Sequence, residues 1–455
     1  MAKRLVSTVA FSVSADLWTS EAKDHYLGCA AHFIDESVAF HTVFVGVHTI
    51  SGHADHAAVV TALKFMFQKL GIDLEEQVRS RKLFAMISDG GGNLRLAAQD
   101  LKTRHERCAA HAINNVVQTC LKAEPWKGLV DKCAAVVQRF HKSCVAMSAL
   151  REQMAKGGSA FESLVDRNDT RWNSTYHMVK RLREVQPAIV QARASLGDAA
   201  AAELTTADFV LLLALEDVLA PFENVTKLLE YKGSHLGGLQ YEVFDTLAKK
   251  CVAGEGELDV LVQLKAALRS GIIQKWNEVL GTSVVPAMTL LDPRTKNLEF
   301  LSDKKKRMEV EAKGKSVVGE LVLGHPWDDD ELPKKKRAVQ FIPSDTGFAA
   351  MLAHILPSAP CPAGTTHVPL SEQFEREYVL YRAEAQTPPT EDPFAWWKSL
   401  RHRYPLLFGA FCMLFSAPVE CERIFSEAGL LAGGTRSSLG RDTVDNILTV
   451  RRNCE

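Results

Sequence analysis

A short, continuously apolar segment at residues 83–87 places the strongest constraint on how this chain can fold. Its sequence, Leu-Phe-Ala-Met-Ile, has the length and composition of a strand that is covered on both faces. The segment ends at Ser88 and Asp89, and a helical pattern at residues 57–70, closed by Gly71, precedes it. Because strands joined by a crossover helix pair in parallel, this arrangement predicts a sheet that contains a parallel pair.

Three β-rich segments precede that helix, at residues 5–13, 26–33 and 38–47. Consecutive strands of this kind are typical of an antiparallel meander. The first segment is interrupted by serine and threonine residues, so a buried strand explains it better than a signal peptide does. The order β-β-β-α-β predicts a mixed sheet with helices on its faces, as in the first part of a ribonuclease H-like fold.

The rest of the chain differs in composition from this first region. From about residue 114 to residue 278 nearly every segment has a helical composition, and Thr205 with Asp208 could form a capping box at the start of one helix. We therefore predict an α/β fold in which a ribonuclease H-like mixed sheet is interrupted by a large all-α domain. The predicted regions are the first part of the core (1–120), a helical insertion (121–300), a charged, proline-containing flexible linker (301–373) and a C-terminal region that completes the core (374–455).

Composition excludes several classes of protein. Hydrophobic residues make up 46% of the 455 residues and charged residues 24%, which excludes wholesale disorder and a collagen-like chain. No apolar stretch approaches the roughly 20 residues that span a bilayer, so we expect no membrane association. The ten cysteines include no Cys-x-x-Cys pair and suit a reducing compartment. Because the net charge is −1, any contact with DNA must come from local basic patches.

Two aspartates stand at the ends of predicted strands. Asp16 follows the first strand and Asp89 the apolar one. If these strands are neighbours in the sheet, their ends can bring both carboxylates within reach of one metal ion. Hard cations such as Mg²⁺ favour carboxylate oxygens, and two such ions support phosphoryl transfer. A turn or helix cap is the alternative role for either aspartate alone.

Several short motifs are spread along the chain, beginning with those that contain the two aspartates. They are Asp-Leu-Trp-Thr-Ser (16–20), His-Phe-Ile-Asp (32–35), His-Thr (48–49), Ser-Asp-Gly-Gly-Gly-Asn (88–93), Cys-Ala-Ala-His (108–111), Arg-Trp-Asn-Ser-Thr-Tyr (171–176), Trp-Trp-Lys (396–398), Tyr-Pro (404–405) and Glu-Arg-Ile-Phe-Ser-Glu-Ala-Gly (422–429). Together these motifs resemble those of the hAT superfamily of cut-and-paste DNA transposases.

The resemblance implies a metal-dependent activity that cleaves and transfers DNA strands. By the family's pattern Asp16, Asp89 and Glu422 are the catalytic carboxylates and the ligands of two Mg²⁺ or Mn²⁺ ions, while Trp18 and Asn93 support their motifs. Pro418 suits the first turn of a helix that would carry Glu422. The neighbouring Glu420 and Glu427 are interpreted as solvent-exposed.

Two further motifs leave alternatives open. In the family, the position of Trp172 beside Arg171 stacks against a DNA base, whereas a tryptophan at helical spacing can equally be part of a core. Cys108 and His111 offer two zinc-type ligands but no second pair stands at finger spacing, so we favour a supporting role over a zinc site.

A basic run in the predicted linker resembles a monopartite nuclear localisation signal. It consists of Pro333, Lys334, Lys335, Lys336 and Arg337. An extended, exposed basic run is what the acidic groove of a nuclear import receptor would bind. The predicted location is therefore the nucleus.

The C-terminal region corresponds to the dimerisation segment of the family, which implies a homodimer or a higher oligomer. An apolar cluster at residues 406–415 offers more apolar surface than one short helix needs for its own core, which favours an interface. Family members normally place a BED-type zinc finger before the catalytic region, but here the first predicted strand begins within a few residues of Met1. Either the chain is truncated or it lacks the module that finds transposon ends. The alternative function is a domesticated, non-catalytic nuclear dimer that binds DNA or protein.

Overall fold

The computed structural model describes residues 5–418 apart from residues 6, 20–22, 159, 169–170, 197–203, 231–234, 283 and 324–368. The chain divides into two compact units. Unit 1 comprises Met1–Ala109, Lys232–Glu242 and Glu278–Glu455, and unit 2 comprises Ala110–Tyr231 and Val243–Asn277. The helical region predicted at 121–300 therefore overlaps unit 2, but its last part belongs to unit 1.

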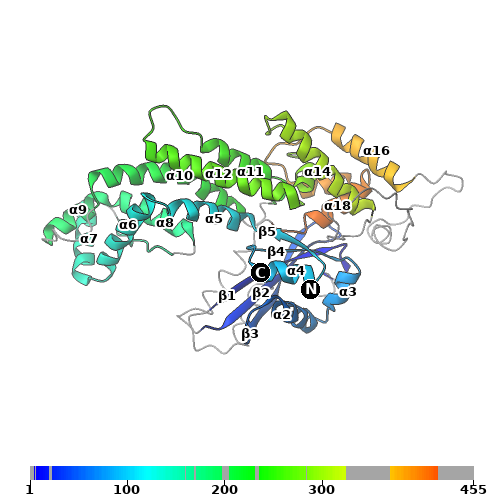
Figure 1. Ribbon diagram of the computed structural model, residues 1–455, viewed down its shortest axis with the longest axis horizontal. Helices are drawn as coiled ribbons and strands as arrows, with labels where there is room; N and C mark the ends of the chain where they lie inside the picture. Colours follow the sequence, from blue (N-terminus) through cyan, green and yellow to red (C-terminus); the bar gives the residue numbers. More distant parts are fainter. Residues whose placement is uncertain are drawn as a thin grey trace. The chain divides into compact units, whose positions relative to one another are not determined.

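Unit 1 is built on a five-stranded mixed sheet (Figure 1). Its strands lie in the order β3-β2-β1-β4-β5. The antiparallel meander and the parallel β1–β4 pair both agree with the order predicted from sequence, and β5 adds a second parallel pair with β4. The strands are β1 (Phe11–Thr19), β2 (His25–Ile34), β3 (Phe40–Ile50), β4 (Leu83–Ser88) and β5 (Arg104–Arg107).

Two strands differ from the prediction. The first strand was expected at residues 5–13, but β1 extends to Thr19, so that Asp16 lies inside the strand rather than at its end. The reason is an alternation of apolar and polar side chains in β1, in which Ser12 and Ser14 are fully buried although they look like surface residues. Strand β5 was not predicted because all four of its residues are polar, and its pairing with β4 overrides their low strand propensity.

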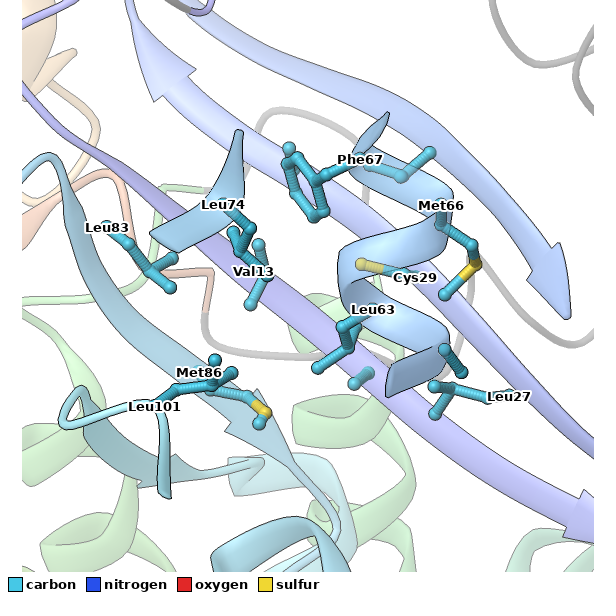
Figure 2. Close-up of a cluster of buried hydrophobic side chains, with 14 of the residues drawn as sticks. Val13, Leu27, Cys29, Leu63, Met66, Phe67, Leu74, Leu83, Met86 and Leu101 are labelled. Atoms are coloured by element: carbon cyan, nitrogen blue, oxygen red, sulfur yellow. The ribbon is translucent and has the colours of Figure 1, made fainter. Parts of the chain in front are cut away.

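One face of the sheet is covered by α2 (His56–Lys69), α3 (Leu74–Arg79) and α4 (Gly92–Asp100). Figure 2 shows this core, in which side chains of β1, β2 and β4 meet those of α2 and α3. The rings of Phe11 and Phe67 stack there with centroids 6.0 Å apart. Helix α2 begins at the N-cap Asp55, whose carboxylate accepts the Ala58 N–H, and the chain after it turns at Gly71, as predicted.

The C-terminal helices of unit 1 pack on the other face, which carries Ser12 and Ser14. The Ser12 and Ser416 hydroxyl oxygens are 2.8 Å apart, and the rings of Phe40 and Phe394 meet edge to face. These helices are α13 (Val285–Leu291), α14 (Lys304–Leu323), α16 (Leu370–Ala383), α17 (Pro393–Leu400) and α18 (Pro405–Leu414). The sheet is therefore buried on both faces, as the apolar composition of β4 requires.

Helix α14 corrects the predicted linker. The segment from residue 301 was expected to be flexible because of its charge, but Lys304–Leu323 is helical. A single buried stripe explains the helix, since Val310, Val318 and Val322 are fully buried beneath an exposed charged face. Residues 324–368 of the predicted linker lie outside the described residues.

The regular secondary structure that is described in unit 2 is entirely helical (Figure 1). The capping box predicted at Thr205 and Asp208 is present, with the Thr205 N–H donating to the Asp208 carboxylate at 2.9 Å and the Asp208 N–H donating to the Thr205 hydroxyl oxygen at 3.1 Å. The helices that build this unit are α5 (Ala109–Leu121), α6 (Trp126–His141), α7 (Cys144–Lys156), α8 (Trp172–Glu184), α9 (Gln186–Ser195), α10 (Thr206–Glu230), α11 (Gln240–Lys250) and α12 (Asp259–Thr282), of which α5, α11 and α12 continue into unit 1.

Candidate active site

Asp16 and Asp89 lie at the same level of two neighbouring parallel strands. Ser14 of β1 is paired with Ile87 of β4, and each aspartate stands two residues further along its own strand direction. Adjacent strands are about 4.8 Å apart, and residues two apart on a strand share a face. The register therefore brings the two aspartates together, although no strand end is involved for Asp16, which is still paired with Gly28 of β2.

Backbone amides orient both carboxylates. The Leu17 N–H donates to Asp16 Oδ1 at 3.1 Å, and the Gly91 N–H donates to Asp89 Oδ1 at 2.8 Å. Gly90 has φ +91°, a conformation that favours glycine, and a Cβ on Gly91 would lie 3.1 Å from Asp89 Oδ1. The glycines thus allow the chain to turn closely around the Asp89 carboxylate, and both aspartates remain half-buried.

The donor set of this pair suits a hard divalent cation. Mg²⁺ is usually held by one or two carboxylates and keeps several waters, which two neighbouring aspartates permit. Among the residues that the structure describes, no group of three or more His, Cys, Asp or Glu side chains could hold a metal ion. Glu422, the third acid of the sequence prediction, lies outside the described residues.

The supporting residues Trp18 and Asn93 occupy the surroundings of the two aspartates. The Trp18 ring, on the same strand face as Asp16, stacks on Tyr26 with centroids 5.8 Å apart. The Asn93 side-chain amide donates to the Ala54 carbonyl at 2.7 Å, which ties the start of α4 to the loop before α2. Asn93 therefore holds the loop that follows Asp89 in place.

A buried hydrogen-bonded chain crosses three strands beside Asp16. His32 Nε2 lies 2.9 Å from the Ser14 hydroxyl, and His32 Nδ1 lies 3.0 Å from the Thr42 hydroxyl. Complete burial lowers the pKa of His32 to about 3, so the imidazole is neutral at physiological pH. The sequence analysis noted His32 only as part of a motif, whereas the structure gives it a role in aligning β1, β2 and β3.

The Cys-x-x-His element lies where β5 leads into α5. Cys108 is buried, and its N–H donates to the Ser88 carbonyl at 2.8 Å, which connects it to the residue before Asp89. His111 lies in the first turn of α5 and is half-buried. Among the described residues neither side chain belongs to a group of three or more potential metal ligands.

The Arg-Trp block forms the start of α8 in unit 2. Arg171 is exposed at the N-cap position, but Trp172 has no exposed surface and packs edge to face against Tyr176 and Phe222. The structure therefore agrees with the core-packing alternative for Trp172. In this conformation the ring presents no face to a DNA base.

Asn173 of the same block contacts an ionic cluster that the sequence analysis missed. Glu223 of α10 is 2% exposed and accepts a hydrogen bond from the Asn173 amide at 2.7 Å. His177 and Lys227 each lie 3.1 Å from its other oxygen. Burial alone would raise the pKa of Glu223, but the hydrogen bonds from His177 and Lys227 lower it below its ordinary value. The spacing of Glu223 and Lys227 on one helix was the signal that could have suggested this cluster.

Several predicted features lie outside the described residues. These are Glu420, Glu422 and Glu427, the basic run of Pro333, Lys334, Lys335, Lys336 and Arg337, and the C-terminal segments 437–439 and 444–453. No described helix is long and apolar enough to cross a membrane.

Two regions of the chain match known protein families. Residues 106–209 match the ZBED1 RNase-like helical domain, and residues 372–454 match the hAT family C-terminal dimerisation region. Over 97% of its length the chain is 22% identical to the "Putative AC transposase" of Zea mays, and it covers 56% of that protein. Together these matches support an hAT-family transposase.

Other relatives match a smaller share of the chain. A match to "Zinc finger BED domain-containing protein 6" of Mus musculus has 22% identity and covers 51% of the chain and 24% of that protein. A match to the "Putative AC9 transposase" of Zea mays has 24% identity and covers 41% of the chain and 23% of that protein. The chain thus spans about half the length of the AC transposase and less of the other relatives.

The match to the hAT dimerisation region supports self-association, but one physical argument for it is wrong. The apolar cluster at 406–415 was expected to be an interface because it exceeds the needs of one helix. In the structure its large side chains are buried within unit 1, with Leu407, Phe411 and Leu414 fully inaccessible. They pack against α17, where the rings of Trp397 and Phe411 stack with centroids 5.2 Å apart. The cluster is therefore part of the core.

Proposed function

We propose that this hAT-family chain cleaves and transfers DNA strands in a metal-dependent reaction, with unit 1 as a ribonuclease H-like catalytic core. The observation that carries this proposal is the placement of Asp16 and Asp89 at one level of the adjacent parallel strands β1 and β4. Both side chains remain half-buried instead of being fully covered, which leaves them accessible to a ligand. Two neighbouring carboxylates that stay accessible suit a metal-dependent phosphoryl transfer.

The two aspartates would hold the divalent ions together with Glu422. Bound Mg²⁺ or Mn²⁺ would stabilise the attacking and leaving oxygens of a phosphodiester and activate a water or a 3′-hydroxyl. The protein's own contribution is to hold the two carboxylates in register through β1 and β4 and to fix one oxygen of each by a backbone N–H. Fixed ligands of this kind need no reorganisation when the substrate arrives.

Partners and location follow from the same assignment. We propose DNA as the substrate, a homodimer or higher oligomer formed through the C-terminal region, and nuclear import through Pro333, Lys334, Lys335, Lys336 and Arg337. The match of residues 372–454 to the dimerisation region supports the second of these. Replacing Lys335 and Lys336 with alanine should leave a fluorescent fusion of the full chain in the cytoplasm.

A plasmid nicking assay tests the activity. The full chain is incubated with a supercoiled plasmid that carries the genomic sequence flanking its coding region, with Mg²⁺, with Mn²⁺ or with EDTA. Nicked circles should form only with a divalent ion. Asp16→Asn and Asp89→Asn should each lower the rate at least about a hundredfold, which corresponds to about 2.7 kcal/mol of barrier.

Matched variants control for loss of charge alone. Asp100→Asn changes an exposed carboxylate at the far end of α4 and should keep full activity. Glu422→Gln should be as inactive as Asp89→Asn, whereas Glu420→Gln and Glu427→Gln should not. Nicking that is unchanged by Asp89→Asn would overturn the assignment.

The second candidate function is a domesticated protein that binds DNA or protein in the nucleus as a dimer without cutting. The similarity to zinc finger BED domain-containing proteins favours it, because these relatives are not named as transposases. The same assay separates the two functions. DNA binding without nicking by the wild-type chain in either metal ion would support the domesticated protein.

A further inference from the structure

We propose that Arg95 and Arg107 form a subsite that binds a backbone phosphate of the DNA strand beside Asp89. This inference deepens the proposed function and rests on DNA being the substrate. Neither arginine belongs to a motif noted in the sequence, and both come from elements that surround the C-terminal end of β4, namely α4 and β5.

The register of β5 places Arg107 next to the Asp89 loop. Arg107 is paired with Ser88 of β4, the residue before Asp89. Its side chain then runs along the loop, since a Cβ on Gly90 would lie 3.4 Å from Arg107 Nε and 3.6 Å from its Cδ. These are ordinary contact distances, so Arg107 lies against the Gly90 backbone, and it is the φ of +91° that favours glycine at this position. The guanidinium is half-exposed and therefore accessible to a ligand.

Arg95 lies on α4, which packs against β5. It lies in the first turn of α4 and is exposed. His105 stands between the two elements, with Nε2 2.8 Å from the Ser88 hydroxyl, and it shares a strand face with Arg107 because the two residues are two positions apart. The second face of β5 is occupied differently, since Glu106 there accepts the Val284 N–H.

The pKa of His105 reflects the charges that surround it. Its pKa is lowered to about 4, first by burial and then by the positive charges of Arg107 and Arg95, against a smaller opposing effect of Asp89. Both guanidinium groups therefore act on one imidazole beside the Asp89 loop. An anion placed there would be attracted by the same two charges.

Glu278 occupies part of this site in the structure. Its carboxylate binds Arg107 Nη1 at 2.9 Å, and the two side chains are 37% and 50% exposed. An ion pair so open to solvent contributes little to stability, so a DNA phosphate can displace it at small cost. Glu278 therefore competes with the phosphate, and its removal should strengthen DNA binding.

DNA binding without catalysis tests the subsite. The probe is a fluorescein-labelled DNA duplex, and its anisotropy is measured with the full chain in EDTA over a range of salt concentrations. Each phosphate contact contributes about 0.9 to the slope of log K against log salt. Arg95→Ala and Arg107→Ala should each reduce the slope by about that amount. Arg79→Ala, which removes an exposed arginine at the end of α3, should not.

A charge-removal pair sharpens the test. Glu278→Gln should strengthen binding more than Glu76→Gln, which removes an exposed carboxylate on α3. The gain should disappear when Arg107 is already alanine, because Glu278 acts through that residue. Circular dichroism and melting temperature check that each variant is folded.

Failure of the subsite and failure of the proposed function give different results. Slopes of Arg95→Ala and Arg107→Ala equal to that of Arg79→Ala would overturn the subsite, even if the wild-type chain nicks DNA. If both variants show the reduced slopes but the wild-type chain does not nick DNA, the subsite is supported and the proposed catalysis is not. Absence of DNA binding by the wild-type chain would overturn both.

Discussion

The hAT motif around Asp16 and Asp89 and the hAT motif around Trp172 have opposite relations to the core. In unit 1 the two aspartates lie half-buried on the interior strand β1 and directly after the interior strand β4. In unit 2 the Arg-Trp block is part of the packing, with a fully buried ring and an amide bonded to the buried Glu223. A family motif therefore marks a position under constraint, and only the structure distinguishes a chemical constraint from a packing one.

This difference predicts how substitutions divide between stability and activity. Changes in the unit 2 block should lower the free energy of unfolding, and changes at the two aspartates should not. Because the chain has two units, stability is best measured locally, by hydrogen exchange of the helices or strands concerned. The predictions below run from the largest expected change in free energy to the smallest.

Trp172→Ala should have the largest effect. Removing a fully buried aromatic side chain costs about 3–5 kcal/mol, and the rings of Tyr176 and Phe222 lose their contact. Amide protection in α8 and α10 should fall accordingly, while Trp172→Phe, which keeps most of the apolar contact, should cost less. If Trp172→Ala weakened DNA binding and left amide protection unchanged, the packing role would be wrong and the stacking role right.

Glu223→Ala should cost about 1–3 kcal/mol, because the buried amide of Asn173 loses its acceptor. The pH dependence gives an independent check. The pKa of Glu223 is lower in the folded state than in the unfolded chain, so its stabilisation is present above the ordinary glutamate pKa and is lost as the pH falls below it. Amide protection of α8 and α10 at acid pH should therefore depend less on pH in Glu223→Gln than in the wild type, and an unchanged profile would contradict the ionic cluster.

The fold of unit 1 could be predicted from sequence wherever burial follows a simple period. The strands β4 and β2 are buried on both faces over most of their length, so their apolar patterns gave bounds within about a residue of those observed. The strand β1 was misplaced because Ser12 and Ser14 are buried polar residues that bond to Ser416 and His32. Hydrogen-bonded burial of this kind depends on partners far along the chain, which a local pattern does not contain.

Only part of the candidate site could be predicted, because some of its residues depend on partners far along the chain. Asp89 directly follows an apolar strand, which is a local signal, and the glycines after it explain its turn. The residues Arg107 and Glu223 were missed because their importance comes from neighbours on other elements, Gly90 and Asn173. The role of Trp172 was left open because its motif is compatible with exposure or burial.

Glu377 in unit 1 offers a carboxylate with the opposite pH behaviour to Glu223. It accepts the Leu406 and Leu407 N–H groups at the start of α18, at 2.9 and 3.1 Å. Burial raises its pKa to about 7 in spite of these bonds. Since the folded-state pKa lies above the ordinary value of 4.5, stability is greatest at acid pH and is lost as the pH rises through about 7.

Amide protection of α18 should therefore decrease between pH 5 and pH 8 in the wild type. Glu377→Gln keeps an acceptor for the two N–H groups without a charge, so it should remove most of this decrease. A matched control is Glu375→Gln, because Glu375 is an exposed neighbour on α16. If Glu377→Gln lowered the protection of α18 at pH 8, the buried charge would be stabilising and the argument would fail.

Asp16→Asn and Asp89→Asn should change the free energy of unfolding least, by no more than about 0.5 kcal/mol. Asparagine keeps an oxygen that can accept the Leu17 or the Gly91 N–H, so the turn after Asp89 remains satisfied. Any change should be towards greater stability, because the substitution removes one of two neighbouring negative charges. Hydrogen exchange of β1 and β4 in EDTA measures it, and a loss as large as that of Glu223→Ala would mean that Asp89 serves the fold, as a turn cap would. Preserved protection together with abolished nicking would separate the two motifs, the first needed for chemistry and the second for packing.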